Sequence, residues 1–247
     1  MKHRQGRVFK LIFLIVMVFG LSGFTMSGDY GHIKSKVVKK IKIPKWYHEG
    51  LYSDGKDIWV NNGNKGDTWV VDTDSGKRIR KIKPAGSFTE AIVPKDNGTF
   101  FVTDWDAKKV YISKIENNNM YALSEMSVEP AHPAGAAWNG SNLFVVTWTR
   151  SLAGTRFHLL KMDTDMNILS TAEIARILEP AHLAWDGKYM WISCWYSKRI
   201  YKVDIEKLEM LGYLKSPAEK TTGIAWAGKY LWVTGTHDNL YKMELQN

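Results

Sequence analysis

Short runs of hydrophobic residues, separated by turns that contain Gly or Asn, repeat along the chain from about residue 48 to its end. In each repeat a polar turn leads into an apolar pair whose last residue is aromatic. These aromatic residues are Trp59, Phe101, Phe144, Trp191 and Trp232, so the repeats have a period of 41 to 47 residues. Runs this short, rich in β-branched and aromatic residues and bounded by turns, predict β-strands.

A second short apolar segment follows each aromatic residue, at residues 69–72, 110–112, 159–163, 200–204 and 240–244. One unit therefore has room for four antiparallel strands. Four-stranded units at this period are typical of a β-propeller, whose blades stack around a central channel. Five units predict an all-β, five-bladed propeller that forms a single domain over residues 34–247.

The last unit ends at Asn247 directly after its third strand, so it lacks an outer strand. Residues 37–43, ahead of the first unit, alternate Val and Ile with Lys and form a spare strand. We expect this strand to complete the fifth blade and close the ring. The alternative is that the Lys-rich stretch is an extended arm that binds an anionic surface. The interleaved Val and Ile favour a strand with one solvent-exposed face.

The N-terminus resembles a secretory signal, because four cations precede an apolar run over residues 11–19 and small residues follow it. We expect residues 1–27 to be this signal, cleaved after Ser22 or Ser27, or else an uncleaved anchor that begins at Val8. The run is short for a membrane span. The prediction is an extracytoplasmic protein, periplasmic, secreted or at the cell surface, whose only membrane contact would be this segment.

The charge and cysteine content of the chain then limit the classes of partner that the sequence predicts. The net charge of +9 includes four N-terminal cations, and their removal leaves 30 basic and 25 acidic residues, an ordinary surface with no indication of a nucleic-acid partner. The only cysteine is Cys194, so no intrachain disulfide can form. We expect a monomer with a peptide or small-molecule ligand and no cofactor.

The innermost strand of each blade begins near the channel mouth, so equivalent positions of the five blades converge there. The strand starts that the repeat assigns to this mouth are residues 48–51, 89–92, 129–132, 179–182 and 221–224. This alignment places up to four glutamates in one funnel, which are Glu49, Glu90, Glu129 and Glu179. It also brings His48, His132 and His182 to the same funnel.

Three tryptophans, Trp105, Trp148 and Trp195, lie four residues after the repeat aromatic of their blades, with Asn61 and Asn62 near the corresponding place in blade one. They predict an aromatic-walled pocket for a cation, an apolar side chain or a sugar. Packing between blades is an equal alternative.

The histidines are either copies of a duplicated Glu-Pro-Ala-His loop or ligands of a divalent metal. None of the common catalytic sequence motifs is present.

From the first blade to the end, the chain resembles the glutamine cyclotransferases, the plant and bacterial five-bladed type of glutaminyl-peptide cyclase. The motifs that carry the resemblance are Trp191-Ile192-Ser193-Cys194-Trp195, Arg199 to Asp204, Thr222 to Trp226, Leu231 to Gly235, and Tyr47-His48-Glu49-Gly50-Leu51. Such enzymes close an N-terminal glutamine onto its own amine and expel ammonia without a metal. The resemblance implies that a carboxylate handles the proton while amide and indole groups hold the substrate.

The chain departs from the family at one position, because Val60 stands where the family has its catalytic Glu. Glu49 or Glu90 would have to supply the acid, and Tyr47 and His48 would lie beside them. The sequence therefore allows an active or altered cyclase and equally a propeller that only binds a peptide end or small ligand. A metal-dependent hydrolase or lyase with a His-rich funnel and a protein-binding scaffold are the other hypotheses.

Overall fold

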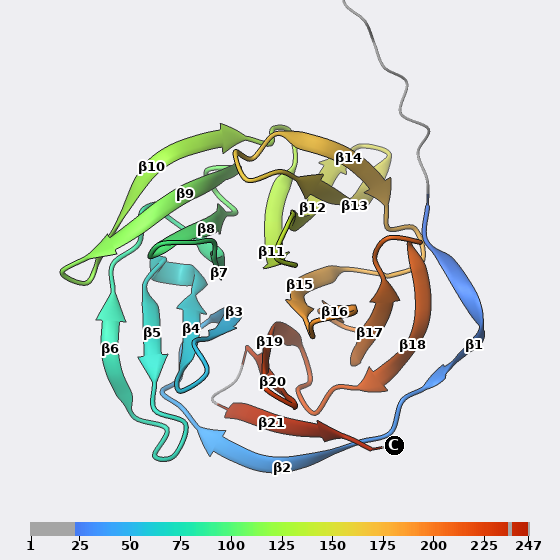
Figure 1. The fold of residues 1–247 in the computed structure, drawn as a ribbon, viewed down its shortest axis with the longest axis horizontal. Coiled ribbons are helices and arrows are strands. Elements are labelled where there is room, and N and C mark those ends of the chain that lie inside the picture. The colour runs from blue at the N-terminus through green and yellow to red at the C-terminus, as the bar shows by residue number, and fades with distance from the viewer. Residues whose placement is uncertain (1–22, 237–238, 247) are drawn as a thin grey trace, which may run out of the picture.

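The computed structural model describes residues 23–236 and 239–246, and within these ranges the protein is all-β apart from one short 3₁₀ turn, η1 (Gly63–Lys65). Five four-stranded antiparallel units stand around a central axis (Figure 1). The predicted five-bladed propeller is confirmed. Along the ring the inner strands contact one another in order, and the inner strand of blade five contacts that of blade one.

Each blade runs from an inner strand at the axis to an outer strand at the circumference. Blade one contains β3 (His48–Ser53), β4 (Ile58–Asn62), β5 (Thr68–Val71) and β6 (Arg78–Ile82). Blade two contains β7 (Thr89–Pro94), β8 (Thr99–Asp104), β9 (Lys109–Glu116) and β10 (Asn119–Ser127). Blade three contains β11 (His132–Trp138), β12 (Leu143–Ser151), β13 (Gly154–Met162) and β14 (Ile168–Glu173). Blade four contains β15 (Pro180–Trp185), β16 (Met190–Cys194), β17 (Arg199–Asp204) and β18 (Glu209–Lys215). Blade five contains β19 (Thr221–Ala227), β20 (Tyr230–Gly235), β21 (Asn239–Leu245) and β2 (Ser35–Lys42).

The first hairpin turn of a blade explains the repeated Asp-Gly signature. In blade one, Oδ1 of Asp54 accepts the backbone N–H of Asp57 at 2.7 Å, and Oδ2 accepts the indole N–H of Trp59 at 2.9 Å. Gly55 takes the φ of +93° that the turn requires. Asp186 makes the same bonds to Tyr189 and to the Trp191 indole in blade four. One carboxylate thus shapes the turn and orients the repeat aromatic.

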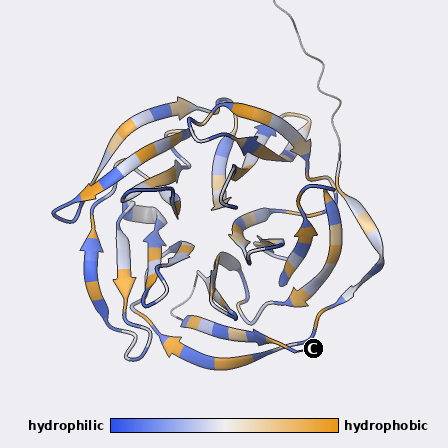
Figure 2. Ribbon diagram, in the orientation of Figure 1, coloured by the Kyte–Doolittle hydropathy of each residue, from blue (hydrophilic) through white to orange (hydrophobic). Residues whose placement is uncertain are grey.

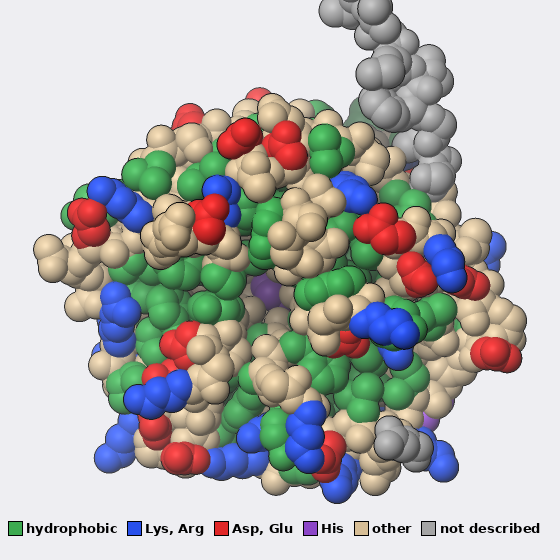
Figure 3. Space-filling model, viewed as in Figure 1, with side chains coloured by type: hydrophobic (Ala, Val, Ile, Leu, Met, Phe, Trp, Pro, Cys, Tyr) green, Lys and Arg blue, Asp and Glu red, His purple; other side chains and the backbone are tan. Residues whose placement is uncertain are grey.

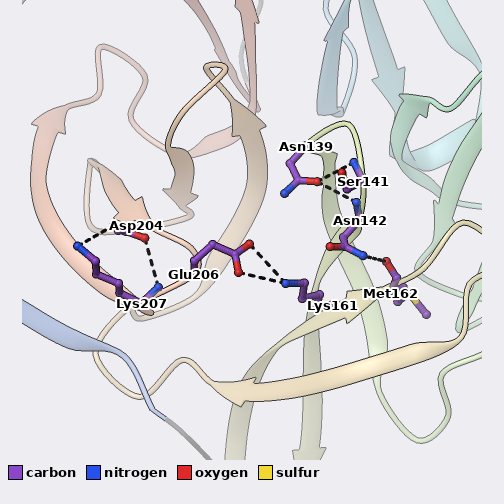
Figure 4. A network of polar contacts seen from close by, with 8 residues as sticks. All are labelled: Asn139, Ser141, Asn142, Lys161, Met162, Asp204, Glu206 and Lys207. Atoms are coloured by element: carbon purple, nitrogen blue, oxygen red, sulfur yellow. Dashed lines mark hydrogen bonds and ion pairs between the residues drawn. The ribbon is translucent and has the colours of Figure 1, made fainter.

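Blade three uses an amide in place of this carboxylate. Oδ1 of Asn139 accepts the backbone N–H groups of Ser141 and Asn142 at 3.0 and 2.8 Å (Figure 4). The same view shows Lys161 of blade three paired with Glu206 of blade four at 3.2 Å. This pair lies at the surface, so it contributes little stability, and the interface depends on apolar packing.

Apolar side chains fill all five interfaces between blades, and the repeat aromatics lie in these cores. Trp59 packs with blade-two residues, Trp191 with blade five and Trp232 with blade one, and each is at most 7% exposed. All three therefore pack between neighbouring blades. Stability therefore comes from five similar interfaces rather than from one central core, and each interface needs both of its blades.

The ring closes through β2, as the sequence predicts. This strand pairs antiparallel with β21, in a register that places Ile41 opposite Leu240 and Lys36 opposite Glu244. Ile41 is 5% exposed and belongs to the core between blades five and one. Val37 and Val38 are 46% and 43% exposed, so only the end of the strand nearest blade one is anchored in a core.

One strand was not predicted from the sequence. β1 (Thr25–His32) adds to the outer edge of blade four by parallel pairing with β18. Phe24, just before it, is 4% exposed and packs with Ile174 and Ile177. The structured domain therefore starts before residue 34, and cleavage after Ser27 would remove the beginning of β1. The rest of the predicted signal, residues 1–22, lies outside the described residues.

Among the described residues, no helix has the length and apolar character needed to cross a membrane.

Candidate functional site

Strand register defines which residues of different blades are equivalent at the channel mouth. Leu51 of β3 pairs with Val60, Ile92 of β7 with Val102, Ala136 of β11 with Val145, Leu183 of β15 with Ile192, and Ile224 of β19 with Val233. Two residues before these, each inner strand presents Glu49, Glu90, Ala134, Ala181 or Thr222. Two residues earlier still, the blades present Tyr47, Phe88, His132, Glu179 or Lys220. The inner strands thus place two successive sets of side chains toward the mouth, and each set contains one residue from each blade.

The structure corrects the alignment of blade three. The repeated Glu-Pro-Ala-His motif equates His132 with His182, but His132 pairs with Trp148 at the start of β11, whereas the backbone of Glu179 bonds that of Trp195. His132 is therefore equivalent to Glu179, and His182 to Gly135. The expectation that the two histidines occupy equivalent positions was wrong, and the alignment is shifted by three residues. The reason is that the first residues of the Glu-Pro-Ala-His motif lie in the loop before the inner strand in blade three.

A pocket of about 310 Å³ opens at this mouth, and six of the predicted site residues line it. These six are Tyr47, Glu49, Glu90, Trp105, Trp148 and Trp195. Glu179 and Ala181 also line it, and they belong to the strand start 179–182 that the sequence assigned to the mouth. The sequence did not single out the remaining lining residues, which are Phe88, Ala134, Arg150 and Tyr196. Hydrophobic side chains also surround the central hollow of the ring on the face that Figure 3 draws. The three tryptophans line the pocket and also pack on neighbouring rings, so both interpretations of them hold in part.

The aromatic wall is held rigid by contacts among its rings. Trp105 and Trp148 meet edge to face with centroids 5.6 Å apart, and the indole N–H of Trp148 donates to the carbonyl of Pro180 at 2.7 Å. The guanidinium of Arg150 lies 5.5 Å from the Trp105 ring and 5.9 Å from the Trp148 ring. Tyr47 and Trp195 face each other at 6.2 Å. These contacts leave little freedom to lose when a ligand enters.

Two carboxyl groups lie at the pocket, and burial dominates the electrostatics of both. The pKa of Glu49 is raised well above its usual range by burial and then by the neighbouring charge of Glu90. Burial, followed by the charges of Asp104 and Asp106, raises the pKa of Glu90 to about 8. The two groups titrate as a pair. A carboxyl of this kind can give up or accept a proton near neutral pH.

The two carboxyl groups differ in access to the pocket. Glu49 is 2% exposed, whereas Glu90 retains part of its surface, and that surface belongs to the pocket. Both groups line the pocket, and Glu90 is the more accessible of the two to a ligand. Tyr47 belongs to the same network, because burial and the charges of Glu49, Glu90 and Tyr196 raise the pKa of its phenol to about 12. Tyr47 stays protonated and can donate a hydrogen bond.

Five other predicted site residues do not line the pocket. Nε2 of His48 lies 2.9 Å from the Pro44 carbonyl, and Nδ1 of His132 lies 3.0 Å from the Trp105 carbonyl, with the His132 ring stacked on that indole. Asn61 bonds the Glu90 carbonyl at 3.0 Å and so positions the strand that carries this acid. The side-chain amide of Asn62 is buried beside it without a hydrogen-bond partner among the described residues.

His182 lies at the channel axis, 2% exposed. A Cβ added to Gly50 would stand 2.3 Å from its Nε2, so the inner strands approach the imidazole too closely for any larger residue there. Burial lowers the pKa of His182 to about 4, which keeps the ring neutral. Within the described ranges no group of three His, Cys, Asp or Glu side chains is placed to hold a metal ion. The hypothesis that His48, His132 and His182 share a metal is therefore not supported.

Val60 takes no part in the site. It is 1% exposed and packs with Leu51 and Trp69 in the core between blades five and one. The position aligned with the family's catalytic Glu is thus structural in this protein. The acidic groups at the pocket come from the inner strands of blades one and two.

The raised carboxyl pKa values predict that stability falls as pH rises above neutrality. Glu90 keeps its proton up to about pH 8 in the folded state, whereas the unfolded chain loses it near pH 4.5. Between these two pH values the folded state therefore binds more protons than the unfolded state, so the free energy of unfolding decreases as pH rises. His182 has the opposite effect, because its lowered pKa makes stability rise with pH, but only between about pH 4 and pH 6.5. Melting temperatures should therefore fall from pH 6.5 to 8.5. The fall should be smaller in Glu90→Gln, and equal slopes in the two proteins would contradict the assignment.

Comparison with known proteins supports the fold. No protein-family model matches the chain, and no curated protein sequence is similar to it. Among solved structures, the glutaminyl cyclase of Myxococcus xanthus superposes with a TM-score of 0.69 at 12% identity, over 86% of this chain and 96% of that one. A nidogen/laminin complex gives a TM-score of 0.55 at 16% identity, over 78% and 73% of the two chains. A virginiamycin B lyase from Staphylococcus aureus, solved with quinupristin, gives 0.50 at 16% identity, over 81% and 66%. At these identities the similarity establishes a shared propeller architecture.

Proposed function

We propose that this protein is exported, and that it binds the N-terminus of a peptide in its central pocket and cyclises it when the first residue is glutamine. The observation that carries the proposal is that the pair Glu90 and Glu49 lines an aromatic-walled pocket. The N-terminal apolar run supports export. Similarity to the Myxococcus xanthus glutaminyl cyclase agrees with this choice among propeller functions, although it concerns the fold.

The pocket has the size and charge for a peptide end. Its volume of about 310 Å³ is in the range of small-ligand sites and accommodates one residue and part of the next. The carboxyl group of Glu179 attracts an ammonium group, and the indole faces favour both a cation and an apolar backbone. A free α-amine is the feature that this chemistry would recognise, so blocking it should remove affinity.

The reaction needs one group that moves a proton. The neutral α-amine attacks the side-chain carbonyl carbon of glutamine, a C–N bond forms, and the bond to the side-chain amide nitrogen breaks to release ammonia. The attacking nitrogen loses a proton and the leaving nitrogen gains one. Glu90 can carry that proton, because its pKa of about 8 lies close to neutrality.

Two further groups assist this transfer. Glu49 is a positioning residue, since it is almost fully buried and its titration is linked to that of Glu90. The indole N–H of Trp195, a pocket residue, has no hydrogen-bond partner among the described residues and can donate to a ligand oxygen after a small shift. A donor at that place would stabilise negative charge on the carbonyl oxygen during the attack.

The first test is ammonia release from short peptides that begin with glutamine, measured with the purified protein. The proposal expects turnover with these peptides and none with their N-acetylated forms. The second measurement is quenching of tryptophan fluorescence by peptides with free and acetylated ends. Saturable quenching by free ends without ammonia release would overturn the catalytic part and leave a binding protein. Absence of both signals would overturn the whole proposal.

A further inference from the structure

Positive charge is concentrated in one part of the ring. Residues 34–83, which contain β2 and blade one, include 13 basic and 6 acidic residues. Residues 84–247, which contain the other blades, include 17 basic and 18 acidic residues. The net charge of the folded ring therefore comes almost entirely from the outer strand of blade five and from blade one.

The cations of this region stand at the circumference, on β2, β6 and the segments beside them. We define the basic edge as the exposed side chains of Lys36, Lys40, Lys45, Lys77, Arg78 and Arg80. Of these six, only Lys36 forms an ion pair within the described residues, with Glu244 at 2.9 Å. Figure 3 shows lysine and arginine side chains gathered along the lower left rim, where Figure 1 places β2 and β6.

The two strands of the basic edge meet at one corner. Lys39 of β2 pairs with Asp74 of the turn before β6 at 3.0 Å. A groove of about 670 Å³ runs along this corner and is lined by Trp46, Lys77 and Arg78 among others. The cations of blades five and one therefore form one continuous surface. It is distinct from the pocket, which opens at the channel mouth.

Large apolar side chains are exposed between these cations. Val37, Val38 and Ile79 are 46%, 43% and 56% exposed, and Trp46 is 36% exposed. Ile79 lies between Arg78 and Arg80 on the exposed part of β6, a strand that Figure 2 colours largely hydrophilic. Cations bind anionic lipid headgroups, while an exposed Trp and aliphatic side chains favour the boundary between headgroups and acyl chains. A soluble polyanion would use the charges but would gain nothing from the apolar residues.

We infer that the basic edge is a docking surface for an anionic phospholipid bilayer. The outer strands β2 and β6 lie against the membrane, Lys and Arg contact the headgroups, and Trp46, Val38 and Ile79 enter the interface. Edge-on docking leaves the pocket at the channel mouth uncovered. The inference is independent of what the pocket binds.

The test compares sedimentation of the full chain with two kinds of vesicle, pure phosphatidylcholine and a mixture with about one third phosphatidylglycerol. The apolar N-terminal run is present in every variant, so its contribution cancels. We expect the wild type to prefer the anionic vesicles. The triple change Lys40→Glu, Lys45→Glu and Lys77→Glu should lower that preference about tenfold or more, and high salt should do the same.

A matched control reverses three exposed cations on blades three and four, Arg156→Glu, Lys188→Glu and Lys215→Glu. It changes the total charge equally, so an equal loss in both triple variants would overturn the assignment of the surface. The pair Val38→Ser and Ile79→Ser separates a bilayer from a polymer. Weaker vesicle binding with unchanged binding to soluble polyphosphate supports the bilayer. Tight binding to polyphosphate without binding to anionic vesicles, or no preference for anionic vesicles, overturns the inference.

Discussion

Glu90→Gln should lower the rate of ammonia release from glutamine-initiated peptides by roughly 10²- to 10⁴-fold, the usual contribution of a general acid–base group. The amide keeps the size of the side chain and its backbone contacts, so the pocket should stay intact. It cannot carry a proton between the attacking and leaving nitrogens. Tryptophan quenching by the same peptides should change much less than the rate.

Glu129→Gln is the matched control, because Glu129 is an exposed residue of the loop before β11 and does not line the pocket. Its rate should equal that of the wild type. Glu49→Gln should shift the pH at which the rate is half-maximal, since Glu49 and Glu90 titrate together. A Glu90→Gln protein with wild-type turnover would contradict the assignment of the proton carrier.

The second large effect is expected at the ring closure. Ile41→Ala should lower the free energy of unfolding by roughly 2–5 kcal/mol, because it removes a buried side chain from the core between blades five and one. Val38→Ala on the same strand should cost far less, because Val38 is 43% exposed. Urea unfolding followed by tryptophan fluorescence measures both changes.

Deletion of residues 34–44 is the stronger form of this experiment. It removes the whole outer strand of blade five, which leaves the outer edge of β21 unpaired and part of a core open. A sharply lower melting temperature is expected. Equal stability of Ile41→Ala and Val38→Ala, or an unchanged melt after the deletion, would show that β2 does not hold the ring closed.

Much of the fold could be predicted from the sequence because each repeat carries its own local signals. Asp54 and Asp186 shape equivalent turns, and Trp59 and Trp191 fill equivalent interfaces. β1 could not be predicted in the same way. It pairs in parallel with a strand whose residues lie 181 to 184 positions further along the chain, and its own sequence, rich in Gly and polar residues, has no periodic pattern.

The site could be predicted only where the repeat fixes the position of a side chain. Glu49, Glu90 and the three tryptophans follow from offsets within the blades, and all line the pocket. His132 was misplaced because a duplicated motif lies in a loop in one blade and at the start of a strand in another. Arg150 and Tyr196 were missed because they lie beyond the aligned positions, where nothing in the repeat fixes them.

The stability and function of the site are expected to conflict. Burial of Glu49 and Glu90 destabilises their charged forms, so substitution by glutamine should remove a cost above neutral pH while it abolishes the proposed chemistry. A glutamine variant that is more stable than the wild type at pH 8.5 and also inactive would show both the gain in stability and the loss of the proposed activity.

The most direct measurement uses a peptide whose N-terminal glutamine carries ¹⁵N in its side-chain amide. Cyclisation predicts that the released ammonia contains the label and that the peptide keeps its α-nitrogen and loses the mass of one ammonia. The Glu90→Gln protein should leave the peptide unchanged. Conversion of glutamine to glutamate by water, or an unaltered peptide after long incubation with the wild type, would contradict the proposed role of the pocket.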